Sequence, residues 1–423
     1  MSSKAQSRSE KVLDFHDARK VVLEHAESVR CLQRDVEKVP ILDSAGRTLA
    51  EDILADRDFP PFPRATRDGY AVRNLDVRNL PAELKLVGEV RAGGGMPAGF
   101  TGLHANQAIA IMTGAPVPNG ADAVVMIEYT ERHGDRVRTL KPVSAGENIV
   151  PRGSEARAGS VLIERGKVVS HPQIALAASV GKCNLAVYAR PRVSILSTGD
   201  EVVPIDHVPG DHQIRNSNSF SLAAQVAAAG GEPVQLAIAP DERTRLRELI
   251  AQGLNSDLLL LSGGVSAGEY DLVEDVLSEF AVEFLFTGVQ IQPGKPLVFG
   301  RARESHSSSS KSTYFFGLPG NPISTMVTFQ LFASVMVGAL SGVRCLPLRA
   351  TKVQLAADVH VKAGLTRFLP AKLSGAWNDA AVELIKWQGS GDIAAFSRAD
   401  CLLVIPADRE NFAPGEWMTV LPL

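Results

Sequence analysis

Residues 193–201 read VSILSTGDE, and residues 258–271 read LLLLSGGVSAGEYD. Each stretch is a short apolar run followed by a turn of glycines, hydroxyls and carboxylates. Around them the chain alternates strands with helices, such as FSLAAQVAAAGG at 220–231 and DERTRLRELIAQGL at 241–254. Repeated strand-helix units predict an α/β fold with a mostly parallel sheet covered on both faces. Ligands of such sheets bind beyond the carboxyl ends of the strands.

The turns after these strands carry residues suited to a phosphate and a divalent cation. Glycines let backbone N–H groups approach an anion, and a helix that starts after the turn adds a favourable dipole. Carboxylates repel a bare phosphate unless they hold a cation that bridges to it. The pattern therefore predicts Mg²⁺ at Glu201 and Asp271. For any one turn alone, a tight turn with solvated acids is the alternative, and neither turn matches a Walker or dinucleotide motif.

Two more turns follow later strands of the same region. In QPGKP at 292–296, Lys295 is a rigidly presented cation suited to an oxyanion, or else a surface lysine. In GLPGNP at 317–322, the prolines and glycine force a sharp turn into a helix and leave N–H donors exposed. Three glycine-containing turns on one sheet favour a common anion site.

Short alternating runs with glycine- and proline-rich turns predict β structure elsewhere. The first such region runs from Pro60 to about Lys141 and forms a small β-rich module. Within it, turn capping is the simplest role for Asp68 and Thr113. From about Leu346 the chain returns to this pattern, which predicts a separate C-terminal β domain.

One helix, predicted at 14–29 with Asp14 as its cap, places His25 on an apolar stripe, where a packed histidine is expected. A longer segment, from Gly317 to Val343, has no charged residue and is long enough to span a bilayer. Its asparagine, serine, threonine and glutamine side chains favour a helix buried inside a domain. We therefore expect no membrane association.

Composition excludes several protein classes. The 423 residues carry a net charge of only −3, so no basic excess supports nucleic-acid binding. Four scattered cysteines without a C-x-x-C motif suggest neither a zinc site nor a disulfide framework. The polar start of the sequence lacks the apolar core of a secretory signal. These features predict a cytoplasmic protein.

The motifs taken together, in their order, resemble a known family. They are PPFPRATRDGYAVR, IMTGAPVPNGADAVV, LSTGDEVV, QIRNSNS, LSGGVSAGEYD, QPGKP, GLPGNPIS and QGSGDI, and they cover nearly the whole chain. The set is similar to molybdopterin molybdenumtransferase, the molybdenum-inserting family that includes the E domain of gephyrin. The resemblance implies a role in molybdenum cofactor biosynthesis. The implied reaction inserts molybdate into adenylylated molybdopterin in a Mg²⁺-dependent step that releases AMP.

The resemblance also implies an elongated, four-part subunit. Its parts are a discontinuous N-terminal region (12–60 and 140–188), an inserted β-rich module (61–139), a molybdopterin-binding α/β domain (189–345) and a C-terminal β-barrel domain (346–423). The family works as a homodimer with the site between subunits, so a homodimer is expected here. The molybdopterin adenylyltransferase that supplies the substrate is an expected partner.

Functional positions are carried over by motif. Catalytic roles are implied for Asp68, Thr113, Glu201, Asp271 and Lys295, with Glu201 and Asp271 serving the metal and the pterin phosphate. Lys295 is expected to face molybdate together with Pro296, Ser324 and Ser390. The cofactor-binding set implied in full is Thr198, Gly199, Asn216, Ser262, Gly263, Gly264, Ser266, Pro319, Gly320, Asn321, Pro296, Ser324, Arg367 and Ser390.

The chain departs from the family pattern at several positions. Glu155 and Asn216 stand where many relatives have aspartate, and Gln292 replaces a lysine found in some. Leu365 follows Gly364 where relatives carry arginine. In a β-strand, positions 365 and 367 point to the same face, so Arg367 is expected to substitute.

Two other functions fit parts of the pattern. One is a non-catalytic molybdopterin-binding scaffold, which gephyrin suggests because it also clusters receptors. The other, inferred from the turns without the resemblance, is a Mg²⁺-dependent nucleotide hydrolase.

Overall fold

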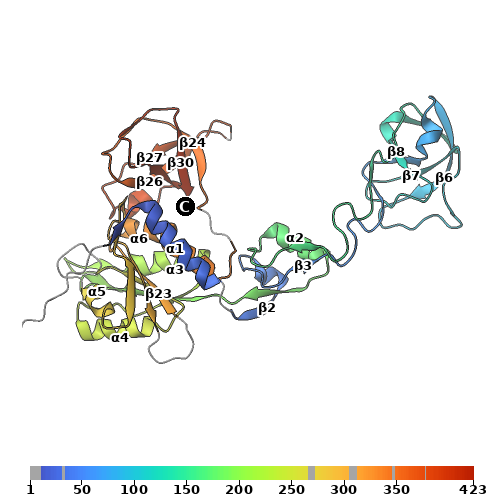
Figure 1. The fold of residues 1–423 in the computed structure, drawn as a ribbon. Helices are drawn as coiled ribbons and strands as arrows, with labels where there is room; N and C mark the ends of the chain where they lie inside the picture. Colours follow the sequence, from blue (N-terminus) through green and yellow to red (C-terminus); the bar gives the residue numbers. More distant parts are fainter. Residues whose placement is uncertain (1–10, 31–33, 265–271, 304–311, 345–347, 377) are drawn as a thin grey trace, which may run out of the picture. The chain divides into compact units, whose positions relative to one another are not determined.

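The computed structural model describes residues 11–30, 34–264, 272–303, 312–344, 348–376 and 378–423. The chain is multidomain and rich in β-sheet, and it divides into two compact units that are described here one at a time (Figure 1). Unit 1 comprises Met1–Ala50, Gly166–Ser170 and Leu185–Leu423, and unit 2 comprises Glu51–Arg165 and His171–Asn184. The four-part division expected from the sequence stays a prediction.

A six-stranded sheet forms the centre of unit 1, in the order β17-β14-β18-β23-β22-β19. The pairs β14–β17, β14–β18 and β18–β23 are parallel, and the pairs β22–β23 and β19–β22 are antiparallel. The strands are β14 (Arg192–Ser197), β17 (Glu232–Gln235), β18 (Leu258–Ser262), β19 (Val282–Phe286), β22 (Val298–Arg303) and β23 (Ser312–Leu318).

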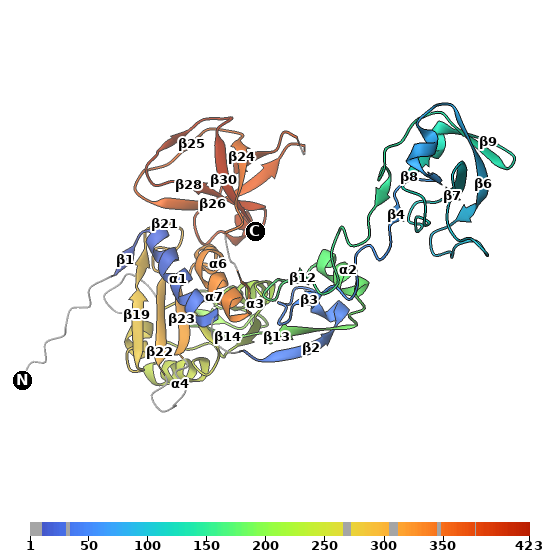
Figure 2. The ribbon, with the colours of Figure 1, turned by 45° about the vertical axis from the view of Figure 1, so that its right-hand side comes forward.

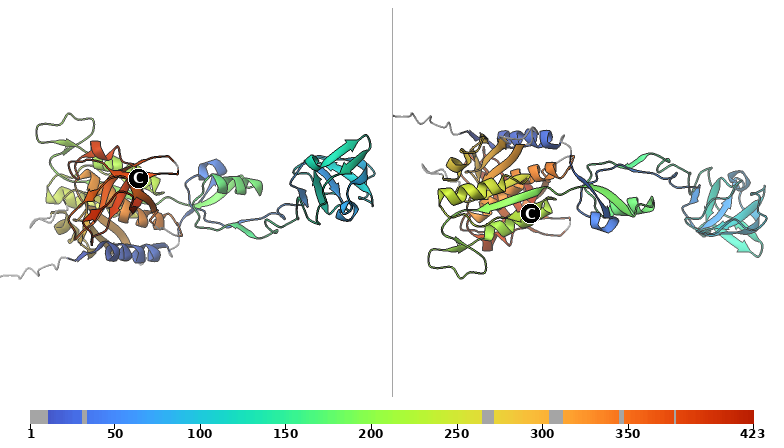
Figure 3. Two further views of the ribbon diagram at one scale, coloured as in Figure 1. Left: turned by 90° about the horizontal axis from the view of Figure 1, so that it is seen from above. Right: turned by 90° about the horizontal axis from the view of Figure 1, so that it is seen from below.

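Helices cover both faces of this sheet. Leu258 and Leu260 pack on one face with α1 (Phe15–Arg30), α3 (Ser217–Ala228), α6 (Pro322–Thr328) and α7 (Ser334–Leu340). Leu259 and Leu261 pack on the other with α4 (Arg243–Gly253) and α5 (Leu272–Leu277). Successive side chains of a strand point to opposite faces, so the run LLLL is apolar throughout because both faces are buried. The covering helices of unit 1 can be followed in Figure 3.

The N-terminal helix matches its prediction closely. The Asp14 carboxylate accepts the Asp17 backbone N–H at 2.8 Å and so caps α1. His25 packs edge-on against Phe299 and Tyr314, and its Nδ1 lies 3.1 Å from the Tyr314 hydroxyl. Burial and, next, the charge of Arg301 hold the pKa of His25 below its usual value.

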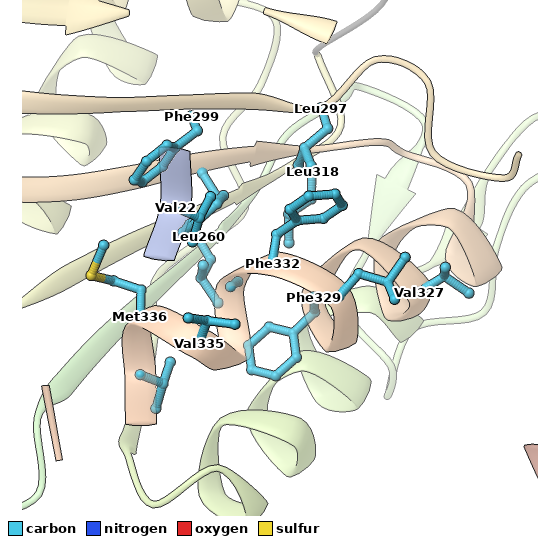
Figure 4. Close-up of a cluster of buried hydrophobic side chains, with 14 of the residues drawn as sticks. Val22, Leu260, Leu297, Phe299, Leu318, Val327, Phe329, Phe332, Val335 and Met336 are labelled. Atoms are coloured by element: carbon cyan, nitrogen blue, oxygen red, sulfur yellow. The ribbon is translucent and has the colours of Figure 1, made fainter. Parts of the chain in front are cut away.

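The uncharged segment forms a core helix from Pro322 to Leu340, in which α6 and α7 flank a π-helical turn, η4 (Phe329–Ala333). The helix is long and apolar enough to cross a membrane, yet 78% of its most apolar window is buried inside the protein. Figure 4 shows its side chains packed with those of the sheet and of α1: Val22, Leu260, Leu297, Phe299, Leu318, Val327, Phe329, Phe332, Val335 and Met336. The expectation of a buried helix is confirmed.

The C-terminal part of unit 1 is a closed five-stranded barrel around its own core. Its strands are β24 (Thr351–Leu355), β26 (Thr366–Ser374), β27 (Ala381–Leu384), β28 (Cys401–Ile405) and β30 (Trp417–Pro422), and pairing of β26 with β28 closes it. The short β21 (Ile291–Gln292) pairs with β26, and α8 (Ile393–Phe396) lies between β27 and β28 in the chain. The expected C-terminal barrel is therefore present.

Four small two-stranded pairings complete unit 1. They are β1 (Val12–Leu13) with β20 (Gly288–Val289), β2 (Val36–Pro40) with β13 (Asn184–Tyr188), β15 (Val202–Val203) with β16 (Ile214–Arg215), and β25 (Val359–His360) with β29 (Asn411–Phe412). A 3₁₀ turn, η1 (Ile41–Ser44), follows β2.

Unit 2 is built on a second six-stranded sheet, in the order β8-β5-β7-β6-β10-β9, of which β6, β7, β8 and β9 are labelled in Figure 2. The strands are β5 (Gly69–Val72), β6 (Ala82–Val90), β7 (Gln107–Ile111), β8 (Ala123–Met126), β9 (Thr130–His133) and β10 (Arg136–Thr139). Apolar side chains of the unit form two separate clusters. The remaining elements are β3 (Ile53–Leu54), β4 (Arg64–Ala65), β11 (Ile149–Val150), β12 (Val161–Ile163), α2 (His171–Ser179), η2 (Asn74–Val77) and η3 (Ile127–Tyr129).

Candidate functional site

Three turns of unit 1 begin at the same edge of its six-stranded sheet. The parallel register pairs Ser197 at the end of β14 with Ser262 at the end of β18, and Ser262 with Leu318 at the end of β23. Backbone hydrogen bonds continue the alignment, from Thr198 N–H to the Ser262 carbonyl (3.1 Å) and from Gly263 N–H to the Leu318 carbonyl (3.3 Å). The turns that follow these strands therefore lie together.

These turns line a cavity of about 430 Å³. The residues of the sequence-based set that it brings together are Thr198, Glu201, Asn216, Ser262, Gly263, Gly264, Pro296, Pro319, Gly320 and Asn321. Arg215 and Asn218 line it as well and were missed by the sequence reasoning. The motif I-R-N-S-N could have indicated both asparagines, but the sequence-based set included only the first, Asn216.

Glu201 is exposed, and its carboxylate folds back over the turn that precedes it. Gly199 has φ +128°, and a Cβ there would overlap the Glu201 carboxylate. A side chain at position 199 would therefore displace this carboxylate. The glycine keeps an acidic group directly beside the end of β14.

Asn216 is 7% exposed and serves the start of α3. Its Oδ1 accepts the Ser219 N–H (3.1 Å) and the Ser197 hydroxyl (3.0 Å), and its Nδ2 donates to Ser219 Oγ (2.9 Å). The amide thus caps the helix and links it to β14, although the residue lines the cavity. An aspartate here would lack the N–H that Ser219 Oγ accepts.

A second and larger cavity, of about 790 Å³, adjoins the first and shares Val202 and Asn216 with it. Gly199 and Asp200 line it beside apolar side chains, including Phe220 and Ile238. Phe220 is exposed in the free chain. The two cavities flank the turn that carries Glu201.

The residues expected to face molybdate belong to the loop after β21, to α6 and to the barrel. Lys295 is exposed, whereas Ser324 is buried on the first turn of α6. The carbonyl of Ser390 accepts the Ile323 N–H of the same helix at 3.0 Å. Asp392 holds the Ser390 loop by accepting the Ala395 and Gln388 N–H groups, which lower the pKa of its carboxyl.

Arg367 is 8% exposed and contacts Gln292 of β21, the strand that precedes the Lys295 loop. Its Nε donates to Gln292 Oε1 at 2.7 Å, and its Nη1 donates to the Leu365 carbonyl at 3.2 Å. Arg367 thus contacts two of the departures from the family pattern, Gln292 and Leu365. β26 begins at Thr366, so Leu365 precedes the strand instead of sharing a strand face with Arg367.

In unit 2, Asp68 and Thr113 are joined directly. Asp68 precedes β5 and Thr113 follows the neighbouring β7, and Asp68 Oδ1 accepts the Thr113 N–H at 2.6 Å. This bond, and then one from the Thr113 hydroxyl, lowers the pKa of the Asp68 carboxyl. Both residues are exposed, and Glu155 of the same unit forms an ion pair with Arg64 at 3.0 Å.

Asp271 and Ser266 lie outside the described residues. Within the residues that the structure does describe, no group of three or more His, Cys, Asp or Glu side chains could hold a metal ion. Glu201 is the carboxylate from the sequence-based metal pair that can be placed. Mg²⁺ is often held by one or two carboxylates together with substrate phosphates and water, and a single placed carboxylate fits that pattern.

Comparison with protein families gives three matches along the chain. The MoeA N-terminal region (domain I and II) matches residues 13–181, a probable molybdopterin binding domain matches residues 194–338, and the MoeA C-terminal region (domain IV) matches residues 352–423.

Curated relatives named molybdopterin molybdenumtransferase are similar over most of the chain. The protein from Nostoc sp. is 33% identical over 92% of this chain and 89% of its own length. The protein from Staphylococcus aureus strain Mu50 is 30% identical over 90% of both chains.

Solved structures agree with these matches. One structure of the molybdopterin biosynthesis moeA protein from Pyrococcus horikoshii shares 32% identity, with a TM-score of 0.68 over 97% of this chain and 99% of that chain. Another shares 28% identity, with a TM-score of 0.75 over 98% of this chain and 100% of that chain. The chain belongs to the molybdopterin molybdenumtransferase family.

Proposed function

We propose that this enzyme inserts molybdate into adenylylated molybdopterin and releases AMP. The observation that carries the proposal is the cavity at the ends of β14, β18 and β23, in a chain whose relatives are named molybdopterin molybdenumtransferase. That cavity combines glycine turns, an acidic side chain and a basic one, Arg215, which suits a substrate that carries both a ring and a phosphate.

Charge is the main obstacle to the reaction. Molybdate is a dianion, and it must approach an anionic dithiolene beside a phosphate, so cations are needed to offset the repulsion. Lys295 and Arg367 supply positive charge on either side of the β21–β26 pairing. Gln292 orients the guanidinium of Arg367 without neutralising it. We assign these two cations, with Pro296, Ser324 and the Ser390 loop, to molybdate.

Mg²⁺ is assigned to Glu201, together with Asp271. Glu201 and Asp271 would hold the ion, and when bound there it would neutralise charge on the substrate phosphate. The position of the Glu201 carboxylate against Gly199, between the two cavities, supports this assignment.

The two adjoining cavities fit the two halves of the substrate. We place the pterin in the smaller cavity and the adenylyl group in the larger one, where Phe220 offers an exposed aromatic face for stacking. The phosphate linkage then crosses the Thr198–Glu201 turn. Hydrolysis of the phosphoanhydride at that point adds water across the bond, and it leaves AMP in the larger cavity and the phosphorylated pterin in the smaller one.

The finer features follow from family membership. We propose the four-part division with the boundaries given above, in which the molybdopterin-binding α/β domain holds the mostly parallel sheet. We also propose a homodimer that receives substrate from a molybdopterin adenylyltransferase in the cytoplasm. Asp68 and Thr113 are assigned a catalytic part as one hydrogen-bonded unit.

The test is AMP release by the purified chain with Mg²⁺ and molybdate. We expect AMP from adenylylated molybdopterin and none from ATP. Release from ATP at a similar rate would identify a nucleotide hydrolase, and tight molybdopterin binding without AMP from either compound would identify a scaffold.

A further inference from the structure

We propose that a third cavity of unit 1 binds a small organic carboxylate that carries a short apolar group. This cavity has a volume of about 300 Å³ and is lined by residues of α1, of the core helix, of β30 and of the segment before β24. It shares no lining residue with the two cavities at the strand ends. The inference therefore goes beyond the proposed function.

Two arginines give the cavity a positive charge. Arg19 of α1 is half-buried, and burial lowers its pKa to about 10, so its guanidinium is still a cation at neutral pH. Arg349 is exposed and lines the same cavity. The lining contains no aspartate or glutamate among the described residues, and it keeps a net positive charge even when the α-carboxylate of Leu423 is counted. An anion is therefore the complementary ligand.

A hydrogen bond to the core helix holds the Arg19 side chain. Its Nη1 donates to the Leu331 carbonyl, in the π-helical turn η4. A carbonyl has no net charge, so this contact fixes the guanidinium without neutralising it. Arg19 is thus a positioned cation in the cavity wall.

The π-helical turn also shapes the cavity. The Ser334 N–H donates to the Phe329 carbonyl, five residues back, and the Gln330 carbonyl accepts the Ser334 hydroxyl instead, at 2.8 Å. Gln330 Nε2 donates to the Pro422 carbonyl of β30 at 2.7 Å. Both Gln330 and Ser334 line the cavity. Turns of this kind are rare in α-helices and are frequent at functional sites, which independently favours a ligand here.

Apolar side chains form the rest of the wall and decide the class of anion. Val335 and Leu421 are each 3% exposed, and Leu348 packs against the same core. An inorganic oxyanion has no apolar part to cover this side, whereas a hydrocarbon group buries apolar surface there. Guanidinium groups match the planar carboxylate with paired hydrogen bonds. A volume of about 300 Å³ limits the ligand to a small molecule.

The test is an NMR titration of the whole chain with 3-methylbutanoate, at neutral pH and fixed ionic strength. The wild-type chain should bind it saturably, with a roughly millimolar Kd for so small a ligand. The neutral isostere 3-methylbutanamide should bind about tenfold more weakly, because it lacks the charge that the arginines recognise. Inorganic phosphate, which lacks the apolar group, should also bind more weakly than 3-methylbutanoate.

Three variants separate charge from shape. Arg349→Gln should weaken binding of 3-methylbutanoate about fivefold and leave the fold intact, since the residue is exposed. Ser334→Leu, which fills the cavity and suits a helix, should abolish binding while both arginines remain. Arg245→Gln is the matched control, because Arg245 is an exposed arginine of α4 that does not line the cavity. This control should bind as the wild type does.

Contrary results would overturn the inference in separate ways. Absence of saturable binding to the wild-type chain would remove the site. Equal affinity for the carboxylate and the amide, or an unchanged Kd in Arg349→Gln, would show that the arginines do not recognise the ligand. Tighter binding of phosphate than of 3-methylbutanoate would exclude an organic ligand. Wild-type affinity in a folded Ser334→Leu variant would place the ligand outside this cavity.

Discussion

The polar groups that line the unit 1 cavity differ in their hydrogen bonding from the Asp68–Thr113 pair of unit 2. In unit 2 the carboxylate is exposed and already accepts the Thr113 N–H. In unit 1, two residues that line the cavity, Thr198 and Asn218, each carry a buried side-chain oxygen with no hydrogen-bond partner among the described residues. An exposed group without a protein partner bonds to water at little cost, whereas a buried one costs free energy until a ligand or water completes it. The unit 1 cavity therefore shows the stronger sign of ligand binding.

Replacing Glu201 by glutamine should have the largest effect. The change removes the placed carboxylate of the proposed metal site while keeping the side-chain shape, so AMP release should fall roughly 100-fold. Initial rates at several Mg²⁺ concentrations measure this effect. Glu279→Gln is the control, because Glu279 follows α5 and forms ion pairs with Arg243 and Arg247 of α4. A wild-type Mg²⁺ dependence in the Glu201 variant would remove Glu201 from the metal site.

Asp68→Asn should have a smaller effect, in the other unit. Asparagine keeps an acceptor for the Thr113 N–H, so unit 2 should remain folded while AMP release falls about tenfold through loss of charge. Circular dichroism and initial rates measure the two results separately. A wild-type rate would leave Asp68 with the turn-capping role alone.

Much of unit 1 could be predicted from the sequence because local pattern and burial agree there. The run LLLL, the Asp14 cap and the uncharged helix all took the structures that their patterns indicate. The π-helical turn within that helix could not be predicted, because its sequence, FQLFA, is compatible with a regular α-helix. No local pattern distinguishes the two.

Long-range contacts explain which features of the site could not be predicted from the sequence. Asn218 becomes a site residue only because β18 and β23 bring Ser262 and Gly320 within reach of its amide. The contact between Arg367 and Gln292 depends in the same way on the pairing of β21 with β26. Asp271 lies outside the described residues, so its part in the metal site stays a prediction.

Gln292→Lys tests that long-range contact. The lysine would remove the acceptor of the Arg367 Nε–H and place a second positive charge beside a buried guanidinium. Unfolding of the chain in urea should become easier by about 1–2 kcal/mol. Gln292→Glu, which keeps an acceptor and adds an opposite charge, should not show this loss. Equal stability of both variants would mean that the contact contributes nothing.

Mild acidification should change the stability of the chain least, and the change should arise in unit 1. Because the pKa of folded His25 lies below its usual value of 6.5, the unfolded chain binds a proton first as the pH falls. The free energy of unfolding therefore decreases as the pH falls from about 6.5 toward the pKa of folded His25. The lowered pKa of Asp68 acts only below the ordinary carboxyl range. Urea unfolding between pH 7.5 and 5 should show a slope that His25→Gln reduces; an unchanged slope would exclude His25 as its source.

The central claim is that the cavities at the ends of β14, β18 and β23 hold the reacting molecules. A crystal structure of the chain with molybdate and AMP tests it most directly. The account predicts AMP in the larger cavity with its phosphate at the Thr198–Glu201 turn, and molybdate beside Lys295 and the Ser390 loop. AMP bound outside the larger cavity, together with molybdate bound away from Lys295 and the Ser390 loop, would contradict it.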